Sequence, residues 1–157
     1  MFKTIVLLIS HGAAAAAGFA LGIYLLPILI APDAPSDSEV AVVSEQAMFS
    51  VTFRKDLPGS DFLHWGEGDL SISARRVSFD GALAPGPDYR LYLTPQLVLT
   101  EQEFLAVKAE SAYVGDIKTF DRFILEVPEN INPASYKAVV VWCETFGEFI
   151  TAAAYQE

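Results

Sequence analysis

Residues 136–149 read YKAVVVWCETFGEF and contain the most apolar stretch of the chain outside its first 31 residues. Within it, four consecutive apolar residues, Ala138 to Val141, stand directly before Trp142. A run of this length without polar alternation is typical of a strand that is buried on both faces. We therefore expect this segment to be a central strand of the fold, with Cys143 at its end.

On either side of this stretch the sequence alternates between apolar and polar residues with a period of two, which is the period of a β-strand. Turns rich in proline, glycine and asparagine separate the pieces. Thr100 to Ala109 differs, because a capping threonine is followed three residues later by Glu103, which indicates a short helix. The pattern predicts an all-β domain over residues 47–157, an antiparallel β-sandwich or barrel. The alternating pieces are 49–53, 70–72, 77–79 and 89–93.

The N-terminal run from Thr4 to Ala31 has 28 residues and no charged side chain, whereas a helix needs about 20 residues to cross a bilayer. A signal peptide has a shorter apolar core and ends at a cleavage site between small residues. Here the small residues Ala31 and Ala34 are each followed by proline, which disfavours cleavage. We therefore expect residues 4–31 to be a retained transmembrane signal anchor.

Charges on the two sides of this run predict its orientation. Lys3 and the N-terminal amine lie on the short side, and the acids Asp33, Asp37 and Glu39 lie on the long side. The positive-inside rule then places the domain outside the cytoplasm. We expect a single-pass protein of the cell inner membrane whose domain faces the periplasm or the cell exterior. Residues 32–46, rich in proline, serine and acids, are typical of an exposed tether.

Composition excludes several classes of function. The chain has 20 acidic and 10 basic residues and a net charge of −10, so the few scattered bases exclude binding to nucleic acid. Cys143 is the single cysteine, which rules out an intrachain disulfide and an all-cysteine metal site. No glycine loop for phosphates and no nucleophile elbow of a hydrolase is present. These absences favour a protein that is not an enzyme with its own substrate pocket.

His64 and Cys143 are the two candidate site residues within the domain. As a pair they could ligate heme or copper, and the spacing alone indicates no zinc or iron site, so the cofactor stays unknown. His64 could also carry protons, or could bond a backbone carbonyl within its loop. Cys143 is either a thiol that exchanges electrons or a small buried hydrophobic residue. Glu144 directly follows it, and an acid beside a thiol is expected to raise the pKa of the thiol.

Several of these residues, taken together, resemble the DM-thirteen domain family over most of Gly59 to Ala154. Two elements about fifty residues apart carry the resemblance: a Gly-Pro-Asp turn that leads into a strand, and a Trp-Cys pair at the end of the apolar strand. The first element is Gly86-Pro87-Asp88 followed by Leu91-Tyr92-Leu93, and the second is Trp142-Cys143. Further matching residues are Phe62-Leu63-His64, Gly66-Glu67-Gly68, Phe79, Val114 to Lys118, Val127-Pro128 and Phe146.

The resemblance implies an electron-transfer module in which the cysteine of the Trp-Cys pair, here Cys143, carries the redox chemistry. Where the family often has a glycine- or asparagine-rich turn and an aromatic before the apolar-proline pair, this chain has 119–123, TFDRF, and Glu144 replaces the usual basic residue after the cysteine. Two hypotheses follow. The chain is a membrane-tethered electron-transfer domain that works with a redox partner protein of the cell envelope, or it is a binding or structural module with an inert cysteine.

Overall fold

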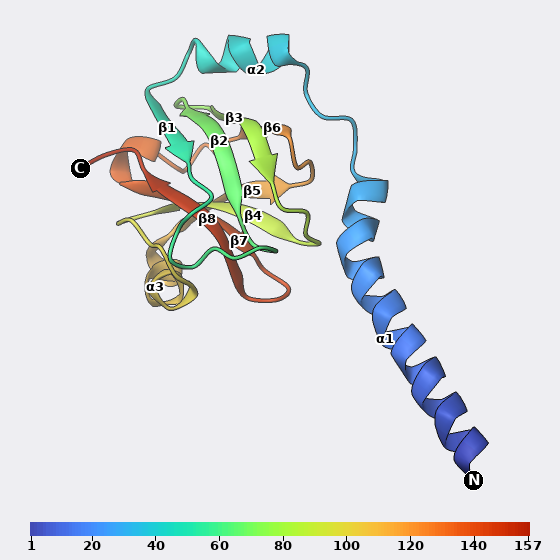
Figure 1. The fold of residues 1–157 in the computed structure, drawn as a ribbon. Helices are drawn as coiled ribbons and strands as arrows, with labels where there is room; N and C mark the ends of the chain where they lie inside the picture. The colour runs from blue at the N-terminus through green and yellow to red at the C-terminus, as the bar shows by residue number, and fades with distance from the viewer.

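A computed structural model describes residues 1–157 and contains two four-stranded antiparallel sheets packed face to face (Figure 1). The expected all-β class is confirmed, as a sandwich. One sheet has the order β1 (Phe49–Phe53), β2 (Gly66–Ile72), β3 (Arg76–Leu83), β6 (Arg122–Glu126). The other has the order β5 (Ala112–Ile117), β4 (Tyr89–Thr94), β7 (Ala138–Cys143), β8 (Glu148–Ala154).

Strand β7 is the central strand that its sequence predicts. It pairs with β4 on one side and with β8 on the other, and all six of its residues are buried. Val139, Val141 and Cys143 face the core between the two sheets. The alternate residues Val140 and Trp142 face the outer side of their sheet. Adjacent residues of β7 therefore belong to two different apolar clusters.

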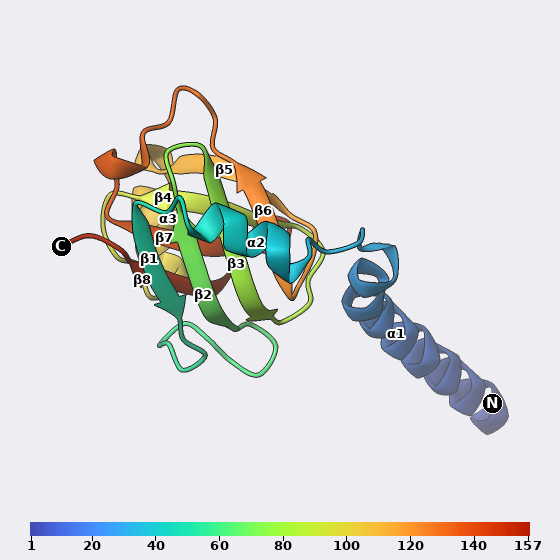
Figure 2. The same ribbon diagram turned by 90° about the horizontal axis from the view of Figure 1, so that it is seen from above.

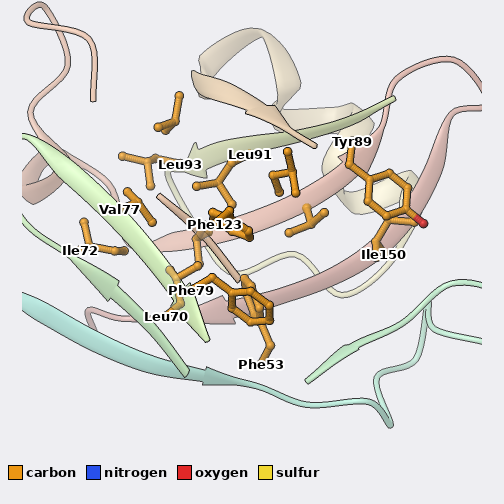
Figure 3. Close-up of a cluster of buried hydrophobic side chains, with 14 of the residues drawn as sticks. Phe53, Leu70, Ile72, Val77, Phe79, Tyr89, Leu91, Leu93, Phe123 and Ile150 are labelled. Atoms are coloured by element: carbon orange, nitrogen blue, oxygen red, sulfur yellow. The ribbon is translucent and has the colours of Figure 1, made fainter. Parts of the chain in front are cut away.

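The core between the sheets is built around three aromatic rings. Phe79 lies in the middle, with its ring centroid 5.1 Å from that of Phe123 and 5.8 Å from that of Phe53. Leu91 and Ile150 of the opposite sheet are fully buried in the same cluster (Figure 3). The alternating strands of the sequence thus turn one face each toward a shared interior.

Helix α3 (Glu101–Val107) covers the outer face of the sheet that holds β7. Thr100 accepts a hydrogen bond from the backbone N–H of Glu103, as the sequence predicts for a capped helix. Phe104 on this helix is fully buried, with its ring centroid 4.8 Å from Trp142 and 5.3 Å from Tyr92. Short 3-10 turns follow at Lys108–Glu110 and, before β7, at Pro133–Ser135.

Helix α2 (Asp37–Ser44) lies across the outer face of the other sheet (Figure 2). Ser36 and Glu39 form a reciprocal capping box at its start, and Val40 and Val43 are buried against the sheet. Asp37 forms an ion pair with Arg122 of β6. The structure therefore differs from the exposed tether expected over residues 32–46, because residues 37–44 form a helix that buries two valines.

Helix α1 (Phe2–Ile30) is long and apolar enough to cross a membrane, and none of its residues is buried. Its position at the N-terminus fits either a membrane anchor or a signal sequence. The helix extends away from the sandwich, and residues in its C-terminal half approach the loop before β4.

The packing of α2 can be tested with two neighbouring valines. Val43 is 2% exposed and Val42 is 52% exposed. We expect Val43→Ala to lower the free energy of unfolding by about 2 kcal/mol, because it removes buried apolar surface and leaves a cavity. Val42→Ala is the matched control and should change it little. Denaturant unfolding followed by tryptophan fluorescence measures both, and equal effects would contradict the packing of α2.

Candidate functional site

Cys143 is the last residue of β7 and carries a free thiol that faces the end of the core. Its residue is 3% exposed. In the strand register it stands opposite Tyr89 of β4 and Glu148 of β8. The thiol is thus enclosed by its own sheet and reaches the surface only at the end of the sandwich.

A cavity of about 490 Å³ opens at this end of the sandwich, and we call it the Cys143 cavity. Three segments of the domain form it: the loop with Leu63 and His64, the loop with Gly86, and the turn between β7 and β8. Residues of α1 between Ala20 and Tyr24 close the opposite side. Most of the lining is apolar, which is typical of a small-molecule site.

His64 lines the Cys143 cavity and is held there by Asp61. Its Nδ1 lies 3.1 Å from the Asp61 Oδ2, and its backbone N–H donates to the Asp61 Oδ1 at 2.8 Å. The His64 side chain thus bonds a carboxylate, and not the backbone carbonyl that is one of the alternatives the sequence leaves open. Slight burial raises the pKa of Asp61, but hydrogen bonds from His64 and Leu63 outweigh it and lower the pKa. The histidine Nε2 has no partner within the chain.

Tyr89 lies beside Cys143 and is 2% exposed. Its ring packs at the edge of the core, and its hydroxyl points away from Leu91 and Phe123 (Figure 3). Gly86 makes this position possible, because a Cβ there would come within 2.4 Å of the tyrosine ring. Burial raises the pKa of Tyr89, so its hydroxyl keeps its proton.

Burial is the main cause that raises the pKa of the Cys143 thiol. The carboxylates of Asp88 and Glu148 add to the increase, and two backbone hydrogen bonds oppose it. The direction expected from the sequence is therefore confirmed, but Glu144 is not its cause. Consecutive strand residues point to opposite faces, so Glu144 lies on the Trp142 side of the sheet, away from the thiol.

Glu144 belongs to a charged network on that outer side. Its Oε1 accepts a hydrogen bond from the Lys108 Nζ at 2.7 Å, and its Oε2 accepts one from the Tyr92 hydroxyl at 3.0 Å. Partial burial would raise the pKa of Glu144, but these bonds lower it. The Lys108 ammonium also lies 5.5 Å from the centroid of the Trp142 ring, within the range of a cation–π contact.

Asp88 fixes the turn that carries the far wall of the cavity. Its backbone carbonyl accepts a hydrogen bond from the Glu144 N–H at 2.9 Å, and its Oδ2 accepts one from the Thr145 hydroxyl at 2.8 Å. The Gly86-Pro87-Asp88 element is therefore connected directly to the segment after Trp142-Cys143. The two sequence elements singled out above meet at one end of the sandwich.

A comparison with family models gives a match over residues 39–155 to the family described as electron transfer DM13. The chain belongs to this family. The match begins within α2 and extends past β8, so it includes both sheets of the sandwich. No curated protein and no solved structure matches the chain.

The structure of this DM13 domain brings both sequence-predicted site residues, His64 and Cys143, to one cavity. It contains no group of three or more His, Cys, Asp or Glu side chains that could hold a metal ion. Sequence reasoning missed Tyr89 and Glu148, which stand opposite Cys143 on the two neighbouring strands. The strand register would have found both, but strand pairing is not visible in a single sequence.

Two acidic residues of the DM13 domain provide a paired test of the thiol's surroundings. The pKa of the Cys143 thiol is raised. The rate at which Cys143 reacts with a small neutral thiol reagent should therefore still increase with pH above the ordinary thiol pKa of about 8.5. Glu148→Gln removes a negative charge opposite Cys143, so the rate profile should move to lower pH. Glu144→Gln should leave it unchanged. A larger shift in Glu144→Gln would show that the thiol senses the outer face.

Proposed function

We propose that this protein is a membrane-tethered, extracytoplasmic electron-transfer domain in which Cys143 is the redox-active group. The observation that carries the proposal is the position of the only thiol on the wall of the Cys143 cavity, which His64 also lines. Membership of an electron-transfer family supports the reaction class. A redox partner protein of the cell envelope would supply and accept the electrons.

The chemistry available to one thiol is exchange with a disulfide. The Cys143 sulfur attacks a partner disulfide, so the partner's S–S bond breaks, a mixed disulfide forms, and the released partner thiolate takes up the proton that Cys143 loses. A thiol of the electron donor then attacks the partner's sulfur in the mixed disulfide, which forms a disulfide between donor and partner, and Cys143 leaves as a thiolate that takes up the donor thiol's proton. Across the cycle the donor thiol is oxidised and one sulfur of the partner disulfide is released as a thiol.

The surroundings of Cys143 make this exchange dependent on a proton acceptor. Burial keeps the thiol protonated by raising its pKa, and the thiolate is the nucleophile. His64 lines the same cavity, and its Nδ1 lies 3.1 Å from the Asp61 Oδ2. His64 is therefore placed to receive this proton as the thiolate forms and to pass it on to the released partner thiolate. His64→Gln should slow exchange at neutral pH and have less effect at high pH.

The redox role is tested by titrating the full chain in detergent with 4,4′-dithiodipyridine, a small disulfide that releases a coloured thiol. The folded protein should release one equivalent, and Cys143→Ser and Cys143→Ala should release none while keeping the circular dichroism spectrum of the parent. Electron transfer to the partner should be lost in both variants. A thiol that reacts only after denaturation would contradict the proposal.

One observation favours a second candidate, a binding or structural module of the cell envelope. Cys143 is only 3% exposed and belongs to the core cluster, as an inert packing residue would. In that case Cys143→Ser would mainly place a hydroxyl in an apolar site, at a cost of about 1–3 kcal/mol in the free energy of unfolding. Cys143→Ala, which adds no polar group, separates this cost from the loss of side-chain volume.

The membrane orientation of the proposal rests on the uncharged helix α1 and on the charges that flank it. Lys3 precedes the helix, and Asp33 follows it, which favours a cytoplasmic N-terminus. Protease added to spheroplasts should remove the sandwich and leave a short membrane-bound fragment. Complete protection of the sandwich, or a soluble form beginning near Pro32, would contradict a retained anchor with an external domain.

A further inference from the structure

We propose that the Cys143 cavity binds the ring of a neutral, membrane-soluble quinone, with the ring between α1 and the end of the sandwich. This inference deepens the proposed function, since it rests on electron transfer by a membrane-tethered domain and names a redox carrier for the same cavity. It concerns binding only, and it does not require Cys143 to be the group that reacts.

The position of the cavity relative to α1 favours a ligand that is dissolved in the lipid. Its lining includes α1 residues from Ala20 to Tyr24. Counted back from Ala31 at 1.5 Å per residue, these lie roughly 10–16 Å inside the end of a membrane-spanning helix. The hydrocarbon core of a bilayer is about 30 Å thick, so this side of the cavity would face the outer leaflet.

The domain side of the cavity has an apolar rim that suits the same position. Phe62 is 85% exposed, Leu63 is 42% exposed and Phe146 is 52% exposed. Leu63 and Phe146 line the cavity, and Phe62 is the chain neighbour of Leu63. Large apolar side chains exposed together mark a surface that contacts a membrane or a partner. Beside a membrane helix, this rim would let a lipid-soluble molecule enter without crossing water.

Tyr89 is the polar group that points to a bound ligand. Its residue is 2% exposed, it lines the cavity, and its hydroxyl makes no hydrogen bond within the chain. This hydroxyl is not one of the side-chain atoms that are fully enclosed without a partner, so it is open to the cavity and free to bond a molecule there. By contrast, the hydroxyls of Tyr92, Tyr113 and Tyr155 all donate to acceptors in the chain. A carbonyl oxygen of a quinone ring is an acceptor for the Tyr89 hydroxyl.

The charges around the cavity exclude phosphate-bearing carriers and fit a neutral ring. No lysine or arginine lines it, whereas nucleotides and flavin nucleotides carry phosphates that need cationic partners. Glu148, which lines the same wall, would repel an anion. His64 adds a group that works with either redox form of a quinone. Its Nε2 donates to a carbonyl when protonated and accepts from the hydroxyl of a quinol when neutral.

The test uses the full chain in phosphatidylcholine nanodiscs and a photoreactive azido-benzoquinone with a decyl tail. After illumination, the labelled peptides should contain 62–64, 85–89 or 146–148, together with α1 residues around Ala20. Excess decylubiquinone should protect against labelling, whereas decylbenzene, which has the tail and a ring but no carbonyl, should not. Equal protection by decylbenzene would mean that the cavity holds a hydrocarbon chain, and labelling spread evenly along α1 would mean partition into lipid. Either result overturns the proposal.

Two pairs of variants separate the site from general effects. Tyr89→Phe removes one hydrogen bond and should weaken decylubiquinone binding about threefold to tenfold, whereas Tyr113→Phe, on the outer face, should not. Ala20→Leu fills the cavity from α1 and should abolish protected labelling. Ala15→Leu makes the same change to α1 outside the residues that line the cavity and should keep it. Full labelling of Ala20→Leu would place the quinone elsewhere.

The quinone-binding site and the redox role of Cys143 can be contradicted independently of each other. Cys143→Ala should retain protected labelling, because the thiol is not needed to hold the ring. If this variant also transfers electrons, the redox role of Cys143 is wrong and the quinone site stands. If instead no protected labelling is found although Cys143 reacts as a thiol, the quinone site is wrong and the thiol chemistry stands.

Discussion

The rest of the structure depends on the burial of β7 on both of its faces. Its inward residues close the core between the sheets, and its outward residues require a second cover, which α3 provides through Phe104. A strand covered on both sides has little freedom to move, since its neighbours β4 and β8 are bonded to it along their length. The end of this strand is where Cys143 lies, so the thiol has a fixed position relative to both clusters.

The same alternation separates two chemical environments that are adjacent in sequence. On the inner side, Cys143 meets Tyr89, Glu148 and the cavity. On the outer side, Trp142 and Glu144 meet Lys108 in a network of charge and aromatic rings. Substituting a residue of one environment therefore need not disturb the other, although the residues concerned are neighbours in the chain.

Much of the fold could be predicted from the sequence, because strand alternation and helix capping are local signals. The central strand, the sandwich class and the helix after Thr100 follow from them. Helix α2 was missed although Ser36 and Glu39 form the same type of capping signal. Its proline- and serine-rich surroundings favoured a tether. The expectation that Glu144 raises the pKa of the Cys143 thiol was wrong for a different reason. The side of a sheet that a residue faces depends on where the strand ends, and a sequence defines strand ends only approximately.

Helix α2 also limits how far the domain can move from α1. With α2 fixed on the sheet by Val40 and Val43, only residues 31–36 connect it to α1. Six extended residues reach about 20 Å, whereas the fifteen residues 32–46 would reach about 50 Å if all were extended. If α1 is anchored in a membrane, this short connection keeps the sandwich close to the lipid. A partner protein would then have to reach the membrane surface to contact the sandwich. Partners that diffuse within the membrane would meet it more readily than partners in the surrounding solution.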